Sequence, residues 1–302
     1  MKKRTKEDTS GHSENAGYAL MSKSSVVICG IARDCSPKLR RLIPKLEELA
    51  NKFKTYKAII VENDSRDDTA ETVLAWATAN KNVIPVLFSV NKHVKTSHQT
   101  ESDEVGDFDY ERISRIAFAR NLYLQELNCV GQTDYVIVVD LDIMDFSIPG
   151  IANSFERYDQ WDCATSSGLR YTLRTPFNST VYWDTYAYEP FGGFADGTQK
   201  LAEIRSSQVL LRKKLKHNEL LPAQSAFGGL AIYRNNILTG NEYRAVENDD
   251  PEVPILCEHV DFHRAISRAS ENFRLVINPA QTLKYESLWT TLKRSIRSLF
   301  SN

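Results

Sequence analysis

The chain has 302 residues, of which 42% are hydrophobic and 25% charged, ordinary values for a globular protein that buries a core. Its 38 Lys and Arg residues balance 39 Asp and Glu residues, so it lacks the basic surplus that favours a nucleic-acid partner. No apolar run approaches the roughly 20 residues that a membrane-spanning helix requires. These values predict one large domain or two small ones, and no nucleic-acid partner.

The beginning of the chain is polar and charged. Residues 1–23 lack the apolar core of a secretory signal, so we expect a disordered tail there. The five cysteines are odd in number and have no paired spacing of the kind seen in metal sites. Reduced thiols in a cytoplasmic protein are the expectation.

Strands and helices alternate through the first half of the chain. Apolar runs at 25–32, 56–62 and 83–90 predict strands, and Tyr135 to Val139 predicts another. Helices are expected after Ser36, after Asp67 or Asp68, and over 112–128, with a long surface loop at 91–111. This alternation predicts an α/β fold with a mixed, mainly parallel sheet flanked by helices.

The second half is less regular. Residues 162–168, 226–234 and 273–278 predict strands separated by long connections. We expect one compact domain over 24–287, with a nucleotide-binding half at about 24–145 and an acceptor or sugar half at about 146–287.

Acidic residues follow two of the predicted strands. Asp140 and Asp142 end the run YVIVVDLD, and residues i and i+2 of a strand point the same way. Glu62, Asn63 and Asp64 end the 56–62 strand. Ligands bind at the carboxyl ends of such strands, and a hard divalent ion held there keeps positions for phosphates. The pattern favours an enzyme acting on a metal-chelated diphosphate, with a helix cap or a solvated turn as the alternative.

The order of these features resembles the metal-dependent nucleotide-sugar glycosyltransferases of the GT-A fold. The resemblance is carried by residues 26–34, 62–65 and 140–142, then Gly228-Gly229 and the segment CEHVDFHR at 257–264. A weaker likeness to fungal capsule-associated α-mannosyltransferases rests on YWDTY at 182–186. The resemblance implies Mn²⁺ or Mg²⁺, a GDP- or UDP-sugar donor and a glycan acceptor. Guanine and mannose are favoured only through the weaker likeness.

The resemblance also implies roles for residues of the first half. Asp142 would bind the metal directly, and Asp140 would contact the metal or the ribose. The nucleotide would lie against Ala32, Arg33, Glu62, Asn63 and Asp64. Asn63 stands where many relatives have aspartate at the base-contacting position, which leaves the base open.

The segment after Cys257 departs from the inverting pattern. His259 replaces the usual catalytic base, and retaining relatives commonly place a C-terminal histidine on the metal. We therefore expect His259 to be a metal ligand, with His263 as its substitute one helical turn later. A hydrogen-bonded structural role is the alternative for both. Glu258 and Asp261 are the other candidates for a base, but neither occupies the expected position, so the sequence favours retention.

Further candidates come from the middle of the chain. Arg120 lies on the inward stripe of the 112–128 helix, so it needs a partner such as Asp140 or a phosphate. Arg112 and Arg115 fit a solvated helix face. An aromatic and acidic segment suggests a sugar pocket, with a minor core as the alternative. The substrate candidates are Trp183, Asp184, Glu189, Gly228 and Gly229.

Two rival functions and one membrane hypothesis remain. A nucleotidyltransferase would carry a glycine-rich basic loop, and residues 29–33 are poor in glycine. A non-catalytic carbohydrate-binding protein would not need the acidic pair. The basic amphipathic segment 288–302 predicts a helix that either lies on a membrane surface or packs on the domain's own core.

Overall fold

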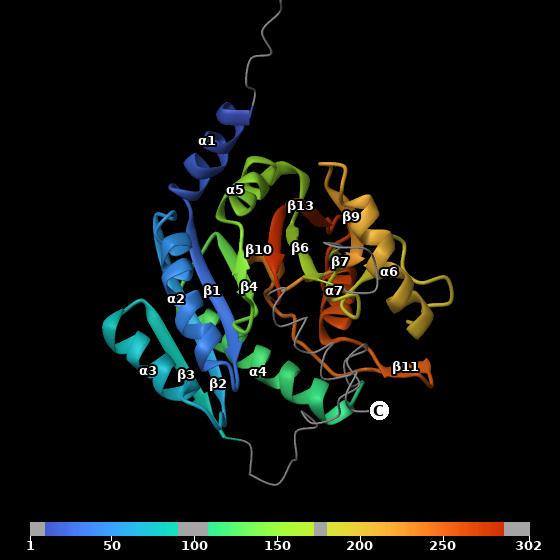
Figure 1. Cartoon of the computed structure of the whole chain (residues 1–302), viewed down its shortest axis with the longest axis horizontal. Helices are drawn as coiled ribbons and strands as arrows, with labels where there is room; N and C mark the ends of the chain where they lie inside the picture. Colours follow the sequence, from blue (N-terminus) through green and yellow to red (C-terminus); the bar gives the residue numbers. More distant parts are fainter. Residues whose placement is uncertain (1–9, 90–107, 172–179, 287–302) are drawn as a thin grey trace, which may run out of the picture.

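The computed structural model describes residues 10–89, 108–171 and 180–286, with the side chains of α1 described from Ala16 onward. These residues form a central sheet with helices on both faces (Figure 1). The helices are α1 (Ser10–Met21), α2 (Ser36–Ala50), α3 (Thr69–Ala79), α4 (Tyr110–Cys129), α5 (Ile148–Glu156), α6 (Leu201–Lys214) and α7 (Glu258–Ala269), with 3-10 turns η1 (Tyr158–Gln160) and η2 (Asn235–Ile237). The strands are β1 (Ser25–Ala32), β2 (Thr55–Asn63), β3 (Val83–Phe88), β4 (Tyr135–Val139), β5 (Asp145–Phe146), β6 (Cys163–Tyr171), β7 (Thr180–Tyr182), β8 (Glu189–Pro190), β9 (Leu221–Ser225), β10 (Leu230–Arg234), β11 (Glu247–Asp250), β12 (Val253–Ile255) and β13 (Leu275–Lys284).

The sheet runs in the order β3-β2-β1-β4-β10-β6-β13-β9-β8. Its first four strands are parallel, so β1, β2 and β4 end at the same edge. β10 lies antiparallel between β4 and β6, and β13 runs parallel to β6. β5 and β7 pair with β13 and β6, while β11 and β12 form a separate hairpin-like pair. The predicted mixed α/β sheet is confirmed, with its parallel strands gathered in the first half.

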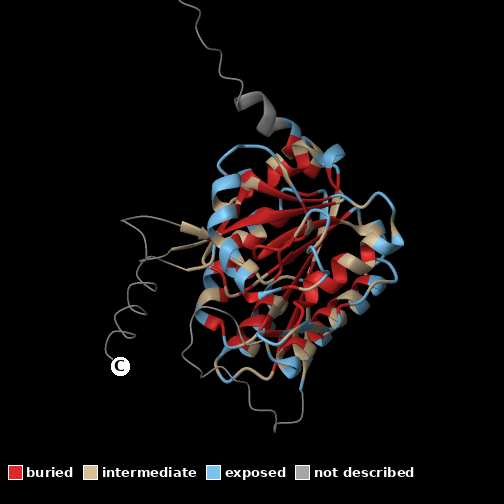
Figure 2. Ribbon diagram, turned by 90° about the vertical axis from the view of Figure 1, so that its right-hand side faces the viewer, coloured by how far each residue is buried: buried red, intermediate tan, exposed pale blue. Residues whose placement is uncertain are grey.

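Two hydrophobic cores cover the two faces of the sheet. Along β4, Ile137 and Val139 join the core under α2 and α5, whereas Val136 and Val138 join the core under α4 and α7. This alternation explains why the strand is apolar at every position. Figure 2 shows the buried sheet in the centre, with exposed residues on the outer faces of the helices. Both carboxylates of the acidic pair follow directly after this rigid strand.

The expectation of a disordered tail over residues 1–23 is wrong for residues 10–21, which form α1. α1 packs on α5 so closely that a Cβ added at Gly17 would lie 1.9 Å from the carbonyl oxygen of Ala152. Met21 is fully buried, and Tyr18 and Leu20 pack partly buried against the same core. The polar composition hides this helix, since its stability comes from a few apolar contacts and a small residue at the crossing.

Several predicted boundaries change. The expected strand at 226–234 begins only at Leu230, because Gly228 and Gly229 form a turn with φ of +64° and +86°. The N-cap of α2 is Cys35 rather than Ser36, with proline still in the first turn. Most of the expected loop at 91–111 lies outside the described residues, and so does the predicted helix at 288–302.

Within the described residues, none of the helices combines the length and the apolar character needed to cross a membrane.

Candidate active site

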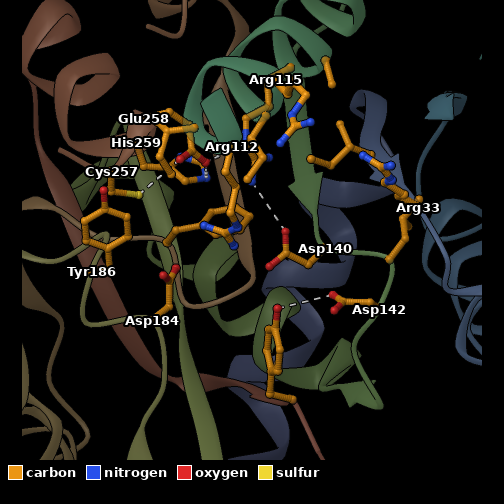
Figure 3. A pocket seen from close by; sticks show the side chains of 18 of the residues that line it. Arg33, Arg112, Arg115, Asp140, Asp142, Asp184, Tyr186, Cys257, Glu258 and His259 are labelled. Atoms are coloured by element: carbon orange, nitrogen blue, oxygen red, sulfur yellow. Dashed lines mark hydrogen bonds and ion pairs between the residues drawn. The ribbon is translucent and has the colours of Figure 1, made fainter. Parts of the chain in front are cut away.

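A cavity of about 350 Å³ lies at the carboxyl ends of the parallel strands, between α4, the start of α7 and the segment after β7 (Figure 3). Ten of the residues singled out from the sequence line it. They are Ala32, Arg33, Asn63, Arg120, Asp140, Asp142, Trp183, Asp184, Glu258 and His259. The fold therefore brings strand-end residues and Arg120 of the first half together with two separate segments of the second half, 183–184 and 258–259.

Three other predicted site residues have structural partners instead. Glu189 is buried and makes a double hydrogen bond with Arg264, with Nε–Oε2 at 2.9 Å and Nη2–Oε1 at 2.6 Å. Asp261 pairs with Arg244 at 3.0 Å and does not line the cavity. Glu62 accepts a hydrogen bond from the Ser65 backbone at 2.8 Å.

The proposed roles of Glu189 in sugar binding and of Asp261 as a base do not fit this geometry.

The cavity gathers four carboxylates. Burial raises the pKa of Asp140 well above its ordinary value, and nearby Asp142, Asp184 and Glu258 raise it further, against the lowering effect of Arg120. Burial, followed by Glu258, raises the pKa of Asp184 to about 7. So much negative charge in a poorly solvated space favours a bound cation.

Arg120 is the buried cation of this cluster. Its Nε donates to Oε1 of Glu258 at 3.0 Å, and its Nη2 lies 3.6 Å from Oδ1 of Asp140. The guanidinium also lies over the rings of Phe227 and Tyr243, at 5.1 and 5.6 Å. Arg120 thus faces inward as the sequence predicts, and of the two partners left open it lies against Asp140, with Glu258 as an additional partner.

The two predicted histidine ligands have different surroundings. His263 is saturated, since Nδ1 and Nε2 each lie 2.8 Å from a hydroxyl, that of Ser225 and that of Tyr233. His259 lines the cavity, stacks on Phe227 at 4.0 Å, and has both ring nitrogens buried without a hydrogen-bond partner. Burial, then Arg120, lowers its pKa well below the ordinary range, so the ring is neutral.

The predicted metal set of Asp140, Asp142 and His259, with His263 as the substitute, is not assembled among the described residues. No group of three or more His, Cys, Asp or Glu side chains there is arranged to hold a metal ion, and His263 is excluded by its two hydrogen bonds. Asp140 and Asp142 still fit a hard divalent cation, because carboxylates are its preferred ligands and this cluster carries excess negative charge. The neutral ring of His259 has no hydrogen-bond partner in the described part of the chain, but it does not form a three-ligand group with these two aspartates.

Two arginine N–H groups of the cavity lack a hydrogen-bond acceptor among the described residues. Nε of Arg33 and Nη1 of Arg120 are buried without hydrogen-bond partners. Buried donors are nearly always paired in native proteins, so unpaired ones in a cavity indicate a missing anionic ligand. Nη1 of Arg33 donates to Oδ1 of Asn63 at 3.4 Å, and Nδ2 of Asn63 donates to the Phe88 carbonyl oxygen at 3.4 Å. This edge belongs to β1 and β2.

Gly228 supports the cavity from behind. Its N–H donates to Oδ2 of Asp184 at 3.2 Å, and a Cβ there would lie 2.1 Å from the Ser166 carbonyl oxygen. The Gly229 carbonyl accepts from the N–H of Asp140 at 2.9 Å. Neither glycine lines the cavity. Both were substrate candidates, but Gly228 lies against the backbone of β6 and against Asp184, and a direct ligand contact of either glycine does not fit.

The sequence missed three cavity residues of clear chemical interest. Arg112 and Arg115, expected on a solvated face, line the cavity, where Figure 3 shows them around Asp140 with Arg33 on the other side. Tyr285, at the end of β13, donates from its hydroxyl to Oδ1 of Asp142 at 3.4 Å. The signal for the arginines was their spacing of three residues, which puts both on one helix face. Nothing local marked Tyr285.

Comparison with known proteins gives structural likenesses only. No protein-family model matches the chain, and no curated protein sequence matches it. A mannosyltransferase from Pyrobaculum calidifontis, solved with GDP-Man and Mn²⁺, is 12% identical with a TM-score of 0.48, over 92% of this chain and 62% of that one. S. aureus TarS with UDP-GlcNAc is 11% identical with a TM-score of 0.44, over 87% and 59%.

A further solved structure with a similar arrangement is glucosyl-3-phosphoglycerate synthase from Mycobacterium tuberculosis, with Mn²⁺, UDP and phosphoglyceric acid. It is 12% identical with a TM-score of 0.45, over 95% of this chain and 81% of that one. The chain spans 62% and 59% of the first two solved chains it matches.

Proposed function

We propose that the chain is a metal-dependent glycosyltransferase that moves a hexose from a nucleoside-diphosphate sugar to a glycan or lipid-linked acceptor. One observation carries the proposal. A single cavity at the ends of parallel strands brings surplus carboxylates together with two buried donor atoms, Nε of Arg33 and Nη1 of Arg120, that have no hydrogen-bond acceptor among the described residues. A metal-chelated diphosphate supplies both the cation and the anion that this arrangement lacks.

The acidic pair would hold the cation. Asp142 and Asp140 are the proposed ligands for Mn²⁺ or Mg²⁺, and His259 is left out of this set because, in the described part of the chain, it is not grouped with them. The ion would stabilise the negative charge that develops on the leaving diphosphate. Tyr285 fixes one oxygen of Asp142, and Lys38 lies 4.0 Å from the other, so this carboxylate is oriented before any ligand binds.

The nucleotide would occupy the edge formed by β1 and β2. Arg33, Ala32 and Asn63 line that side of the cavity, and Arg112 and Arg115 face it from α4 as phosphate contacts. Asn63 carries both a donor and an acceptor group, so it can pair with either a guanine or a uracil edge. GDP-mannose is the first donor to test, on the strength of the mannosyltransferase likeness in the sequence.

Peripheral membrane association through residues 288–302 remains part of the proposal, because a lipid-linked acceptor would be presented at a membrane surface. Co-sedimentation with anionic vesicles, using the full chain and a chain ending at Ser287, tests it. Equal and low pelleting of both would remove the membrane from the proposal.

The proposed function is tested by calorimetric titration of GDP, UDP and their sugars, with and without Mn²⁺. One nucleotide should bind at least about tenfold more tightly with the metal, a difference of about 1.4 kcal/mol. Asp142→Ala should abolish that metal effect, and Asp68→Asn, an exposed carboxylate in an ion pair with Arg40, should leave it intact. Binding without any metal effect would contradict the proposal.

A further inference from the structure

We propose that Asp184 is the catalytic base that takes the proton from the acceptor hydroxyl, and that transfer therefore inverts the anomeric configuration. This inference rests on the proposed glycosyltransferase function. It replaces the retention that the sequence favours, because that expectation rested on the lack of a base near His259.

The first step is the comparison of the carboxylates that line the cavity. Glu258 is held by Arg120 at 3.0 Å, and Asp140 lies against the same guanidinium at 3.6 Å. Asp142 is held by the Tyr285 hydroxyl at 3.4 Å. Asp184 forms no ion pair with any described residue, and its carboxylate accepts only from neutral backbone N–H groups, that of Gly228 at 3.2 Å and that of Ala187. Of the four, it is the carboxylate held by neither a cation nor a phenol among the described residues, so it is available to accept a proton from a substrate.

The second step is the backbone that holds it. Asp184 has a φ of +71°, a left-handed conformation that non-glycine residues rarely adopt. The turn is fixed on both sides, by the bond from Trp183 N–H to the Gly168 carbonyl at 3.0 Å and from Ala187 N–H to the Asp184 carbonyl at 3.2 Å. Strain of this kind persists only where the surroundings enforce it, and it concentrates at functional sites. Here it directs a carboxylate into the cavity (Figure 3).

The third step is the electrostatic surroundings. The charged and titratable groups acting on Asp184, or acted on by it, come from five elements: Cys257 and Glu258 at the start of α7, Arg120 of α4, Asp140 after β4, Tyr182 of β7 and Tyr285 after β13. Burial and Glu258 outweigh Arg120 and raise the pKa of Asp184 to about 7. A base with a pKa near the working pH is both available and strong enough for proton transfer.

The chemical step balances as follows. The acceptor oxygen forms a bond to the anomeric carbon, and its proton moves to a carboxylate oxygen of Asp184. The bond between the anomeric carbon and the phosphate oxygen breaks, and the diphosphate leaves with the electron pair. Asp184 then returns the proton to water. Direct displacement at one carbon inverts it, so an α-linked donor gives a β-linked product.

The test that does not depend on any variant is the configuration of the product. The wild-type chain is incubated with Mn²⁺ and GDP-mannose or UDP-glucose, water serves as acceptor, and early-time proton NMR identifies the anomer released first. The β-anomer is expected. Release of the α-anomer would overturn the role of Asp184 but leave the glycosyltransferase proposal standing. A complete lack of donor cleavage across GDP- and UDP-sugars would overturn both.

The variant test separates a base from a sugar-binding or structural residue. Asp184→Asn keeps an oxygen for the Gly228 N–H but cannot accept the proton. Turnover should fall by about 10²–10⁴-fold, with the affinities for Mn²⁺ and the donor unchanged within about twofold. The rise of turnover with pH through about 7 should vanish as well. Weakened donor binding with the pH profile preserved would overturn the inference, and Asp68→Asn serves as the matched control.

Discussion

Replacing Asp184 by asparagine is expected to change how the stability of the fold depends on pH, without any substrate. In the folded chain the pKa of the Asp184 carboxyl group is about 7, whereas its ordinary pKa is 3.8. Between these values the folded state binds more protons than the unfolded state, so this group lowers the free energy of unfolding as pH rises. In the Asp184→Asn variant, this contribution to the fall in the free energy of unfolding is absent.

The magnitude follows from the difference in pKa. About 3 pH units between 3.8 and about 7 correspond to at most about 4 kcal/mol, because each unit is worth about 1.4 kcal/mol. Asp184→Asn should therefore gain stability relative to wild type as pH rises from about 4 to 7, and then keep a constant advantage. The contribution sits entirely in that window, because below it both states are protonated.

Urea denaturation followed by tryptophan fluorescence at closely spaced pH values measures this difference. Asp68→Asn, on the exposed N-terminal side of α3, should give a curve parallel to wild type. A curve for Asp184→Asn that is also parallel would refute the reasoning, since it would mean that Asp184 is not held in a poorly solvated place. An activity loss coupled to a stability gain is the pattern expected of a functional residue.

Three further predictions concern the same framework. Asp142→Ala should reduce metal-dependent turnover by about 100- to 1,000-fold, or about 3–4 kcal/mol, with an unchanged far-ultraviolet circular dichroism spectrum; turnover within a few-fold of wild type would disprove the metal assignment. Arg120→Met should lower the free energy of unfolding by about 3–5 kcal/mol, because Glu258 is left as a buried unpaired carboxylate; a neutral result by chemical denaturation would contradict the pairing. Gly228→Ala should lower the free energy of unfolding by at least about 3 kcal/mol, because the position has a positive φ and a Cβ there would clash with a β6 carbonyl oxygen. The control Gly131→Ala, at a position with φ +91° and open space, should lower it by only about 1–2 kcal/mol. Equal melting temperatures of the two variants would contradict the expected clash.

The local features of the site were predictable because they follow from strand and helix periodicity. Asp140 and Asp142 end an apolar strand, and the strand ends where the spacing predicts. Arg120 lies on the apolar stripe of α4, and the same stripe places it next to Asp140. Such features depend on residues close in sequence, and the period of 3.6 or 2 residues decides which way a side chain points.

The parts that were missed depend on contacts between distant segments. β10 lies antiparallel between β4 and β6 and brings the Tyr233 hydroxyl to His263, and Ser225 of β9 contacts the same ring. The sequence of α7 alone therefore could not show that both ring nitrogens of this histidine have hydrogen-bond partners. Glu189 and Arg264 are 75 residues apart. Tyr285 reaches Asp142 across 143 residues. The burial of α1 likewise depends on its crossing with α5.

The roles of the carboxylates were ambiguous for a related reason. Asp184, Glu258 and Asp261 are equivalent as sequence letters, and only their neighbours distinguish them. Asp261 forms an ion pair with Arg244 outside the cavity, and Glu258 forms an ion pair with Arg120 inside it. The Asp184 carboxylate accepts a hydrogen bond from the neutral N–H of Gly228, and its backbone has a positive φ; both features come from the tertiary arrangement around Gly228.

The most direct measurement of the central claim is the time course of nucleoside-diphosphate release from GDP- and UDP-sugars, with Mn²⁺ and with a chelator. We expect one donor to yield its nucleoside diphosphate and free sugar with Mn²⁺, and no release above background once the metal is chelated. Pyrophosphate release from a nucleoside triphosphate and a sugar phosphate would instead identify a nucleotidyltransferase. Glycan binding with no cleavage of any donor would identify a carbohydrate-binding protein, and either result would contradict the proposal.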